Sequence, residues 1–78
     1  MMNTPIQKRS LADEVASQIS AYIQSGHYVV NQKLPTEPEL MKQFGVGRSS
    51  IREAIRMLAN SGMLRVQQGV GPLVEEYS

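Results

Sequence analysis

The chain has 78 residues, a net charge of +1 and no cysteine. This length suits one small domain, and the absence of thiols excludes disulfides and thiolate metal sites, so the fold must depend on apolar packing. The polar N-terminus does not resemble a signal peptide, and no segment approaches the roughly 20 apolar residues of a membrane span, so we expect a cytoplasmic protein.

Residues 1–9 are polar and predict a flexible arm, ahead of a single domain over residues 10–76. Ser10 can cap a first helix that ends near Gly26, because its hydroxyl can accept a hydrogen bond from a free amide. Apolar residues recur at helical spacing along this helix and predict the face that packs on the core. These residues are Leu11, Val15, Ile19 and Ile23.

The connection over residues 26–35 is predicted to place Tyr28 and Val29 in the core. Asn31 is suited to a left-handed turn, which asparagine tolerates. Residues 33–34 can form a very short strand before the next helix.

A second helix begins at Thr36 with the pattern T-x-x-E, in which Thr36 and Glu39 each bind the other residue's amide. Pro38 falls in the first turn, where its missing N–H costs nothing. Gly45 ends the helix after little more than two turns. A helix this short is not stable alone, so packing on its neighbours must hold it in place.

A third helix, over about residues 48–61, carries the main prediction about function. Residues four apart on a helix lie about 40° from each other, so an arginine stripe runs beside an apolar stripe. The arginines are Arg48, Arg52 and Arg56, and the apolar residues are Ile51, Ile55 and Leu58. Ser49 and Ser50 add small hydroxyls at the start of the helix. Such a helix can bury one flank and present arginines on another.

The net charge hides an uneven distribution. Between residues 42 and 65 five basic residues face one acid, Glu53. A locally basic face on a near-neutral domain is typical of proteins that bind polyanions. The alternative is a helix surface that solvent and Glu53 neutralise.

Residues 63–66 and 72–74 predict two strands of a hairpin with a glycine-containing tip over residues 67–71. Its apolar side chains are predicted to cover the helices. They are Leu64, Val66, Leu73 and Val74. The fold class is therefore mainly α with a small β-hairpin: a winged helix-turn-helix of three helices and a two-stranded wing.

This fold suits DNA, because the major groove is about 12 Å wide and admits one helix, whose N-terminal half points at base edges. Arginine can bind guanine through two hydrogen bonds, and serine can bind bases or phosphates. Glycine at the wing tip lets the backbone approach closely, and the start of the second helix can meet phosphate. The candidate DNA-binding residues are Arg48, Ser49, Ser50, Arg52, Arg56, Thr36, Gln68 and Gly69. Arg56 lies further along the helix and can instead be structural or reach only phosphate.

No catalytic, cofactor or metal motif is present: there is one histidine, no P-loop, no H-E-x-x-H and no G-x-S-x-G. An enzyme is therefore not expected. The alternative function is a winged-helix module that binds another protein and not DNA. Salt dependence separates the two, because contacts to several phosphates weaken steeply as salt rises.

Three stretches closely resemble the GntR family of bacterial transcription regulators: LPTEPEL, FGVGRSSIREAIRML and SGMLRVQQGVGPLV. The resemblance covers residues 11–74, and the R-x-x-x-R-E-A pattern is most similar to the FadR-type branch. It implies a domain that reads a palindromic operator in double-stranded DNA as a homodimer. It also implies a C-terminal effector domain, absent from these 78 residues, that binds a small metabolite. The matching DNA-contact positions are Arg48, Ser49, Ser50, Arg52, Gln68 and Gly69.

Two departures from the family pattern concern operator contact and local geometry. Pro38 stands where the family usually has a basic residue that contacts DNA, so one expected contact is missing. Gly47 stands where serine or threonine is frequent, and Val30-Asn31 where Pro-Gly is frequent. These positions affect capping and loop geometry, and the fold is still expected.

Overall fold

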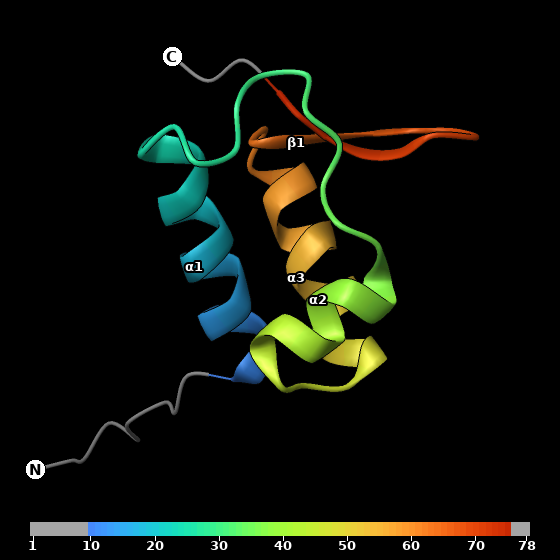
Figure 1. The fold of residues 1–78 in the computed structure, drawn as a ribbon. Coiled ribbons are helices and arrows are strands. Elements are labelled where there is room, and N and C mark those ends of the chain that lie inside the picture. The colour runs from blue at the N-terminus through green and yellow to red at the C-terminus, as the bar shows by residue number, and fades with distance from the viewer. Residues whose placement is uncertain (1–9, 76–78) are drawn as a thin grey trace, which may run out of the picture.

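A computed structural model describes residues 10–75, in which three helices precede a two-stranded antiparallel sheet (Figure 1). The elements are α1 (Leu11–Gln24), α2 (Glu37–Phe44), α3 (Arg48–Asn60), β1 (Leu64–Gln67) and β2 (Gly71–Val74). This is the predicted winged helix-turn-helix. The expected arm over residues 1–9 and the expected domain end at residue 76 lie outside the described residues.

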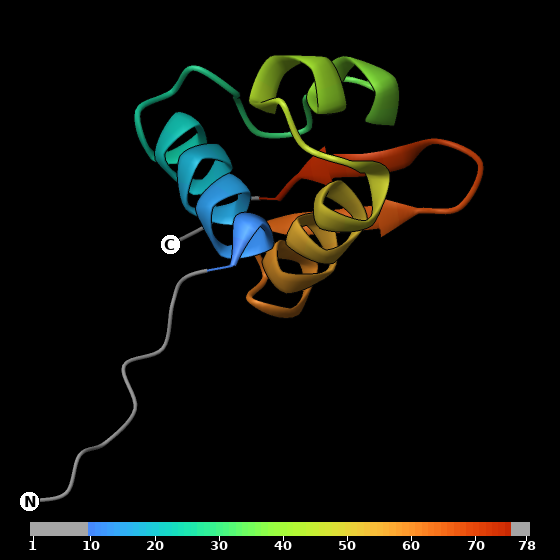
Figure 2. The same cartoon turned by 90° about the horizontal axis from the view of Figure 1, so that it is seen from below.

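The helix α1 packs along α3, and the view in Figure 2 shows the two helices side by side. The predicted cap is present: the Ser10 hydroxyl accepts from the Asp13 amide at 3.0 Å, and the Asp13 carboxylate accepts from the Ser10 amide at 3.1 Å. Val15 and Ile19 are buried as predicted. Leu11 is not, since 60% of it is exposed. Leu11 lines an open hollow together with Ser49 and Ser50 of α3, whose small polar side chains do not fill it.

The connection after α1 buries Tyr28 but leaves Val29 56% exposed, so only half of that core prediction is right. The Tyr28 ring meets the Tyr22 ring edge-on, with 5.3 Å between centroids. The chain then turns: the Gln32 amide donates to the Val29 carbonyl at 2.9 Å, which puts Val29 at an outer corner. Asn31 has the predicted left-handed backbone, with φ of +71°.

The helix α2 begins with the predicted capping box. The Thr36 amide donates to Glu39 Oε1 at 2.8 Å, and the Glu39 amide donates to Thr36 Oγ1 at 3.3 Å. Gly45 closes the helix with φ of +67°, a left-handed conformation that glycine adopts without strain. Leu40 is the one buried residue of α2, and it is fully buried in the core. Caps at both ends and one buried anchor therefore fix a helix of eight residues.

Thr36→Ala should lower the free energy of unfolding by about 1 kcal/mol, because the free Glu39 amide loses its acceptor. Urea denaturation followed by circular dichroism measures this loss. Thr36→Ser keeps the hydroxyl and should remain near the parent stability. A serine variant as unstable as the alanine variant would contradict the capping role.

The hairpin pairs β1 with β2 in the register Leu64↔Val74 and Val66↔Pro72. Leu64, Leu73 and Val74 are buried as predicted, whereas 60% of Val66 is exposed. The outer half of the hairpin extends past α3, so no helix covers Val66 (Figure 1). The predicted short strand at residues 33–34 is present as a bridge between Lys33 and Leu73, which joins the connection before α2 to the wing.

Candidate nucleic-acid interface

The helix α3 buries one flank and exposes the arginine stripe on another. Ile51, Ala54 and Leu58 are buried against the other helices and the sheet. The side chains of Arg48, Arg52 and Arg56 are 53%, 65% and 64% exposed. Gly47 caps the helix without a side-chain hydrogen bond. The start of α3 therefore presents free amides and arginines together.

Glu37 in the first turn of α2 holds two of these arginines side by side. Arg52 Nε donates to Glu37 Oε2 at 2.9 Å, and Arg48 Nε lies 3.3 Å from Glu37 Oε1. Glu53, the acid that the sequence placed beside the stripe, pairs with the third arginine, Arg56, at 2.5 Å. Arg52 donates to Glu37 through Nε, and Nε is also the Arg48 atom in the ion pair, so within residues 10–75 no terminal nitrogen of either guanidinium group makes a hydrogen bond.

The ionisation of these groups follows from the same contacts. The hydrogen bond from Arg52 holds the pKa of Glu37 below its usual value, and the charges of Arg52 and Arg48 act in the same direction. The hydrogen bond to Glu37 raises the pKa of Arg52. The pair therefore stays ionised at neutral pH. A depressed carboxyl pKa means that its contribution is present at neutral pH and is lost as the pH falls through that lowered value.

The predicted residues at the start of α3 separate into two groups. Arg48 and Arg52 meet Glu37 of α2, whereas Ser49 and Ser50 line a shallow hollow with Leu11 at the start of α1. The serines and the arginine pair thus lie on different sides of the helix start. They can reach different parts of a ligand that covers the end of the helix.

The wing tip lies apart from the start of α3. Residues 68–70 form a turn in which the Val70 amide donates to the Gln67 carbonyl at 3.0 Å. Gly69 has φ of +82°, a conformation that favours glycine. The tip is shorter than the predicted 67–71 because Gln67 and Gly71 still pair as strand residues. The turn over residues 68–70, which contains Gln68 and Gly69, is the end of the hairpin that projects away from the helices (Figure 1), so the structure does not bring this turn to the arginines.

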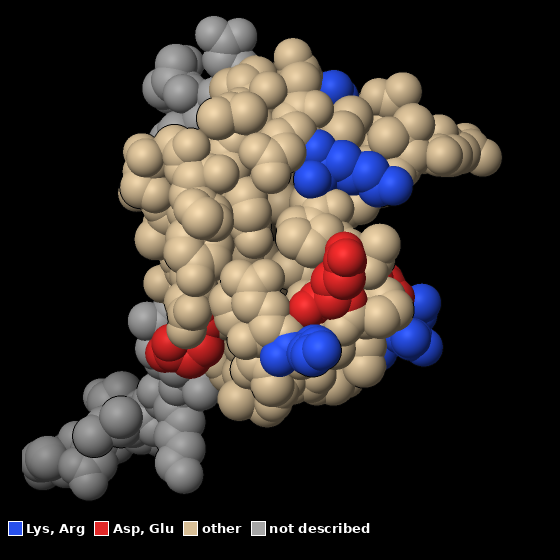
Figure 3. All heavy atoms as spheres, in the orientation of Figure 1, with Lys and Arg blue, Asp and Glu red and all other residues tan. Residues whose placement is uncertain are grey.

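A groove of about 310 Å³ lies between the wing and the start of α3. We call it the wing groove. Its lining is Lys33, Leu34, Pro35, Thr36, Glu37, Arg52, Ile55, Val66 and Pro72. Figure 3 shows the hollow below the projecting wing, with basic side chains above and below it. Sequence analysis did not identify Lys33 or Glu37 as a binding residue, because their place in this groove depends on segments that are separate in the sequence.

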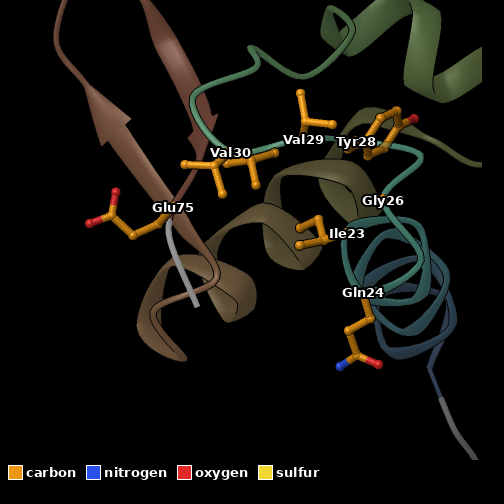
Figure 4. A pocket seen from close by; sticks show the side chains of 8 residues that line it. Ile23, Gln24, Gly26, Tyr28, Val29, Val30 and Glu75 are labelled. Carbon is orange, nitrogen blue, oxygen red and sulfur yellow. The ribbon is translucent and has the colours of Figure 1, made fainter. Parts of the chain in front are cut away.

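A second hollow, of about 430 Å³, lies where α1 ends and β2 leaves the sheet. Ile23, Val29 and Val30 make much of its wall (Figure 4).

No group of three or more histidine, cysteine, aspartate or glutamate residues within residues 10–75 could hold a metal ion. In the same part of the chain, no helix is long and apolar enough to cross a membrane.

A capped α2 that supports α3, with exposed arginines at the start of α3 and a hairpin beside the helix, is the arrangement of a winged-helix DNA-binding domain. Comparison with known proteins narrows this class. The family described as "Bacterial regulatory proteins, gntR family" matches residues 11–74, so the chain belongs to the GntR family. The resemblance to the GntR family drawn from the sequence is confirmed, and the fold is that of the DNA-binding domain of a transcription regulator.

Two curated relatives and one solved structure illustrate the similarity. The HTH-type transcriptional regulator Mce2R of Mycobacterium tuberculosis (strain CDC 1551 / Oshkosh) is 33% identical over 94% of this chain and 30% of its own length. The HTH-type transcriptional repressor NanR of Enterobacter sp. (strain 638) is 34% identical over 83% of this chain and 25% of its own length. This chain therefore spans less than a third of either relative. The DNA-binding domain of AraR, solved in complex with operator ORX1, is 39% identical with a TM-score of 0.80, covering 95% of this chain and 92% of that one.

Proposed function

We propose that this domain reads a short palindromic operator in double-stranded DNA, with α3 in the major groove and the wing at a neighbouring groove or backbone. The observation that carries the proposal is the pair of exposed arginines, Arg48 and Arg52, held side by side at the start of α3. Guanine offers O6 and N7 as two acceptors in the major groove, and the terminal nitrogens of an arginine match them. The operator complex of the AraR domain supports this use of the fold.

The other candidate residues take roles that follow from their positions. Ser49 and Ser50 meet bases or phosphates beside the arginines, and Thr36 meets phosphate at the start of α2. Arg56 is paired with Glu53 and lies further from the helix start, so it serves phosphate only. Gln68 and Gly69 meet the DNA at the wing tip. Pro38, exposed in the first turn of α2, supplies no charge there, which alters operator preference relative to the family pattern.

The proposal extends to the whole regulator. The relatives are more than three times as long as the part this chain matches, which supports a larger protein with residues 10–76 as its DNA-binding domain and residues 1–9 as an arm. We propose a cytoplasmic bacterial homodimer whose C-terminal domain, of the FadR type, binds a small metabolite and controls DNA affinity. Without the dimer, each copy of the isolated domain binds one half of the palindrome independently. The isolated domain should therefore bind DNA weakly.

Selection of bound duplexes from random DNA, followed by affinity measurements at several salt concentrations, tests the proposal. We expect a palindromic or half-palindromic motif to be enriched. The logarithm of affinity should fall with the logarithm of salt by about 0.9 for each phosphate contacted. Failure to enrich any sequence, together with the absence of salt-dependent DNA binding, would favour a module that binds protein.

A further inference from the structure

The wing groove separates the two parts of the domain that we assign to DNA. Arg52 and Ile55 of α3 form one wall, and Val66 and Pro72 of the wing form the other. A duplex that receives α3 in its major groove and meets the wing beside it must pass one sugar–phosphate strand between them. The groove lies where that strand would run, and its two walls suit a strand of alternating sugars and phosphates.

Lys33 stands in this groove on a fixed backbone. It bridges Leu73, and the next amide, that of Leu34, donates to the Pro72 carbonyl at 3.0 Å. The stem of Lys33 lies along the wing, because its Cε would be 3.5 Å from a Cβ built on Gly71. The base of the side chain is therefore held by the sheet while its ammonium group remains exposed.

Lys33 also differs from the arginines in its charge partners. Within residues 10–75 the arginines all pair with acids: Arg48 and Arg52 with Glu37, Arg56 with Glu53, and Arg65 with Glu75. No carboxylate of those residues lies within ion-pair distance of Lys33. An exposed ammonium without such a partner can bind an external anion without first giving up an internal one.

The total charge around the groove favours an anion despite the presence of Glu37. The lining supplies two positive charges, Lys33 and Arg52, and one negative charge, Glu37, which leaves +1. Of the adjoining residues, Arg48 and Glu39 balance each other. The exposed side chain of Val66 and the neighbouring Pro72 add an apolar surface against which a deoxyribose can pack. This accounts for an apolar residue left uncovered on the wing.

We propose that the wing groove holds one phosphate of the DNA strand that runs between α3 and the wing, and that Lys33 binds it directly. The assignment rests on the proposed function. Because a phosphate contact carries no sequence information, Lys33 contributes affinity and register and leaves base preference to α3. Sequence patterns alone placed no DNA contact in this segment.

Lys33→Gln tests the assignment, with Lys42→Gln as the matched control. Lys42 is also exposed and without an ion pair among the described residues, but it lies in the last turn of α2 and does not line the groove. Affinity for the selected duplex and for an unrelated duplex is measured over a series of salt concentrations. Lys33→Gln should weaken both equally and reduce the salt slope by about 1, while Lys42→Gln keeps the parent slope. Lys33→Arg should restore the slope.

The possible outcomes distinguish the role of Lys33 from the proposed DNA-binding function on which it rests. An unchanged slope in a folded Lys33→Gln variant, with binding still weakened in Arg52→Ala, would overturn the role of Lys33 and leave the function standing. Equal changes in Lys33→Gln and Lys42→Gln would reduce the effect to overall charge and also overturn it. If the parent chain bound no duplex at any salt concentration, the proposed function itself would fail, and the Lys33 assignment with it.

Discussion

Arg52→Ala is expected to weaken binding to the selected operator by about 1–3 kcal/mol, with a smaller loss on unrelated DNA. The reason is geometric: Arg52 lies one turn into α3, is 65% exposed, and keeps its terminal nitrogens free while Glu37 holds its Nε. Removing it takes away the proposed base contact and leaves the core untouched. Fluorescence anisotropy with both duplexes, together with a thermal melt of the variant, measures affinity, discrimination and folding.

Arg56→Ala provides the matched comparison. Arg56 is 64% exposed and also paired with a glutamate, but it lies a turn further from the helix start. Its loss should weaken binding by less and by the same amount on every sequence, as expected for a phosphate contact. A folded Arg52→Ala variant that kept the parent discrimination would remove α3 from the role of recognition helix.

Leu40→Ala is expected to lower the free energy of unfolding by about 2–5 kcal/mol, the range for a buried leucine that leaves a cavity. Leu40 is the one buried residue of α2 and is fully buried. A helix of eight residues has little stability of its own, so its position depends on this anchor. Because small domains have limited total stability, the variant should be partly unfolded at 37 °C, which urea denaturation and a thermal melt would show.

Leu11→Ala is the control for this loss, since it removes the same atoms from a side chain that is 60% exposed. Its effect should lie within about 0.5 kcal/mol of the parent, as for most surface substitutions. If both variants lost the same stability, Leu11 would have to be packed as its helical spacing suggested, and the position of the first turn of α1 would be wrong.

The comparison of Leu11 with Leu40 shows what sequence reasoning can reach in this domain. Caps, helix limits and the left-handed Asn31 depend on neighbours within a few residues, and these predictions are confirmed. Leu11, Val29 and Val66 have suitable periodicity or composition, but their exposure depends on whether another element happens to cover them. The local pattern of a segment contains no information about which other elements pack over it.

The proposed DNA interface also combines a feature set by local sequence with one set by contacts between separate segments. The arginine stripe was predictable because it depends only on the helical period. The contact between Glu37 and Arg52 was not, because it joins residues 15 apart across the turn between α2 and α3. Glu37 lies in the first turn of α2, where the helix dipole alone is enough to explain an acid. Sequence alone therefore provided no reason to expect its contact with α3.

The bonds from Glu37 also bear on the entropy of recognition. A long side chain that becomes fixed on binding loses conformational freedom worth about 0.5–1.5 kcal/mol. In the unbound domain Arg52 is hydrogen-bonded to Glu37 and Arg48 forms an ion pair with it, so both side chains have already lost part of their freedom. One carboxylate thus aligns two guanidinium groups in advance, and binding selects a geometry that the domain holds by itself.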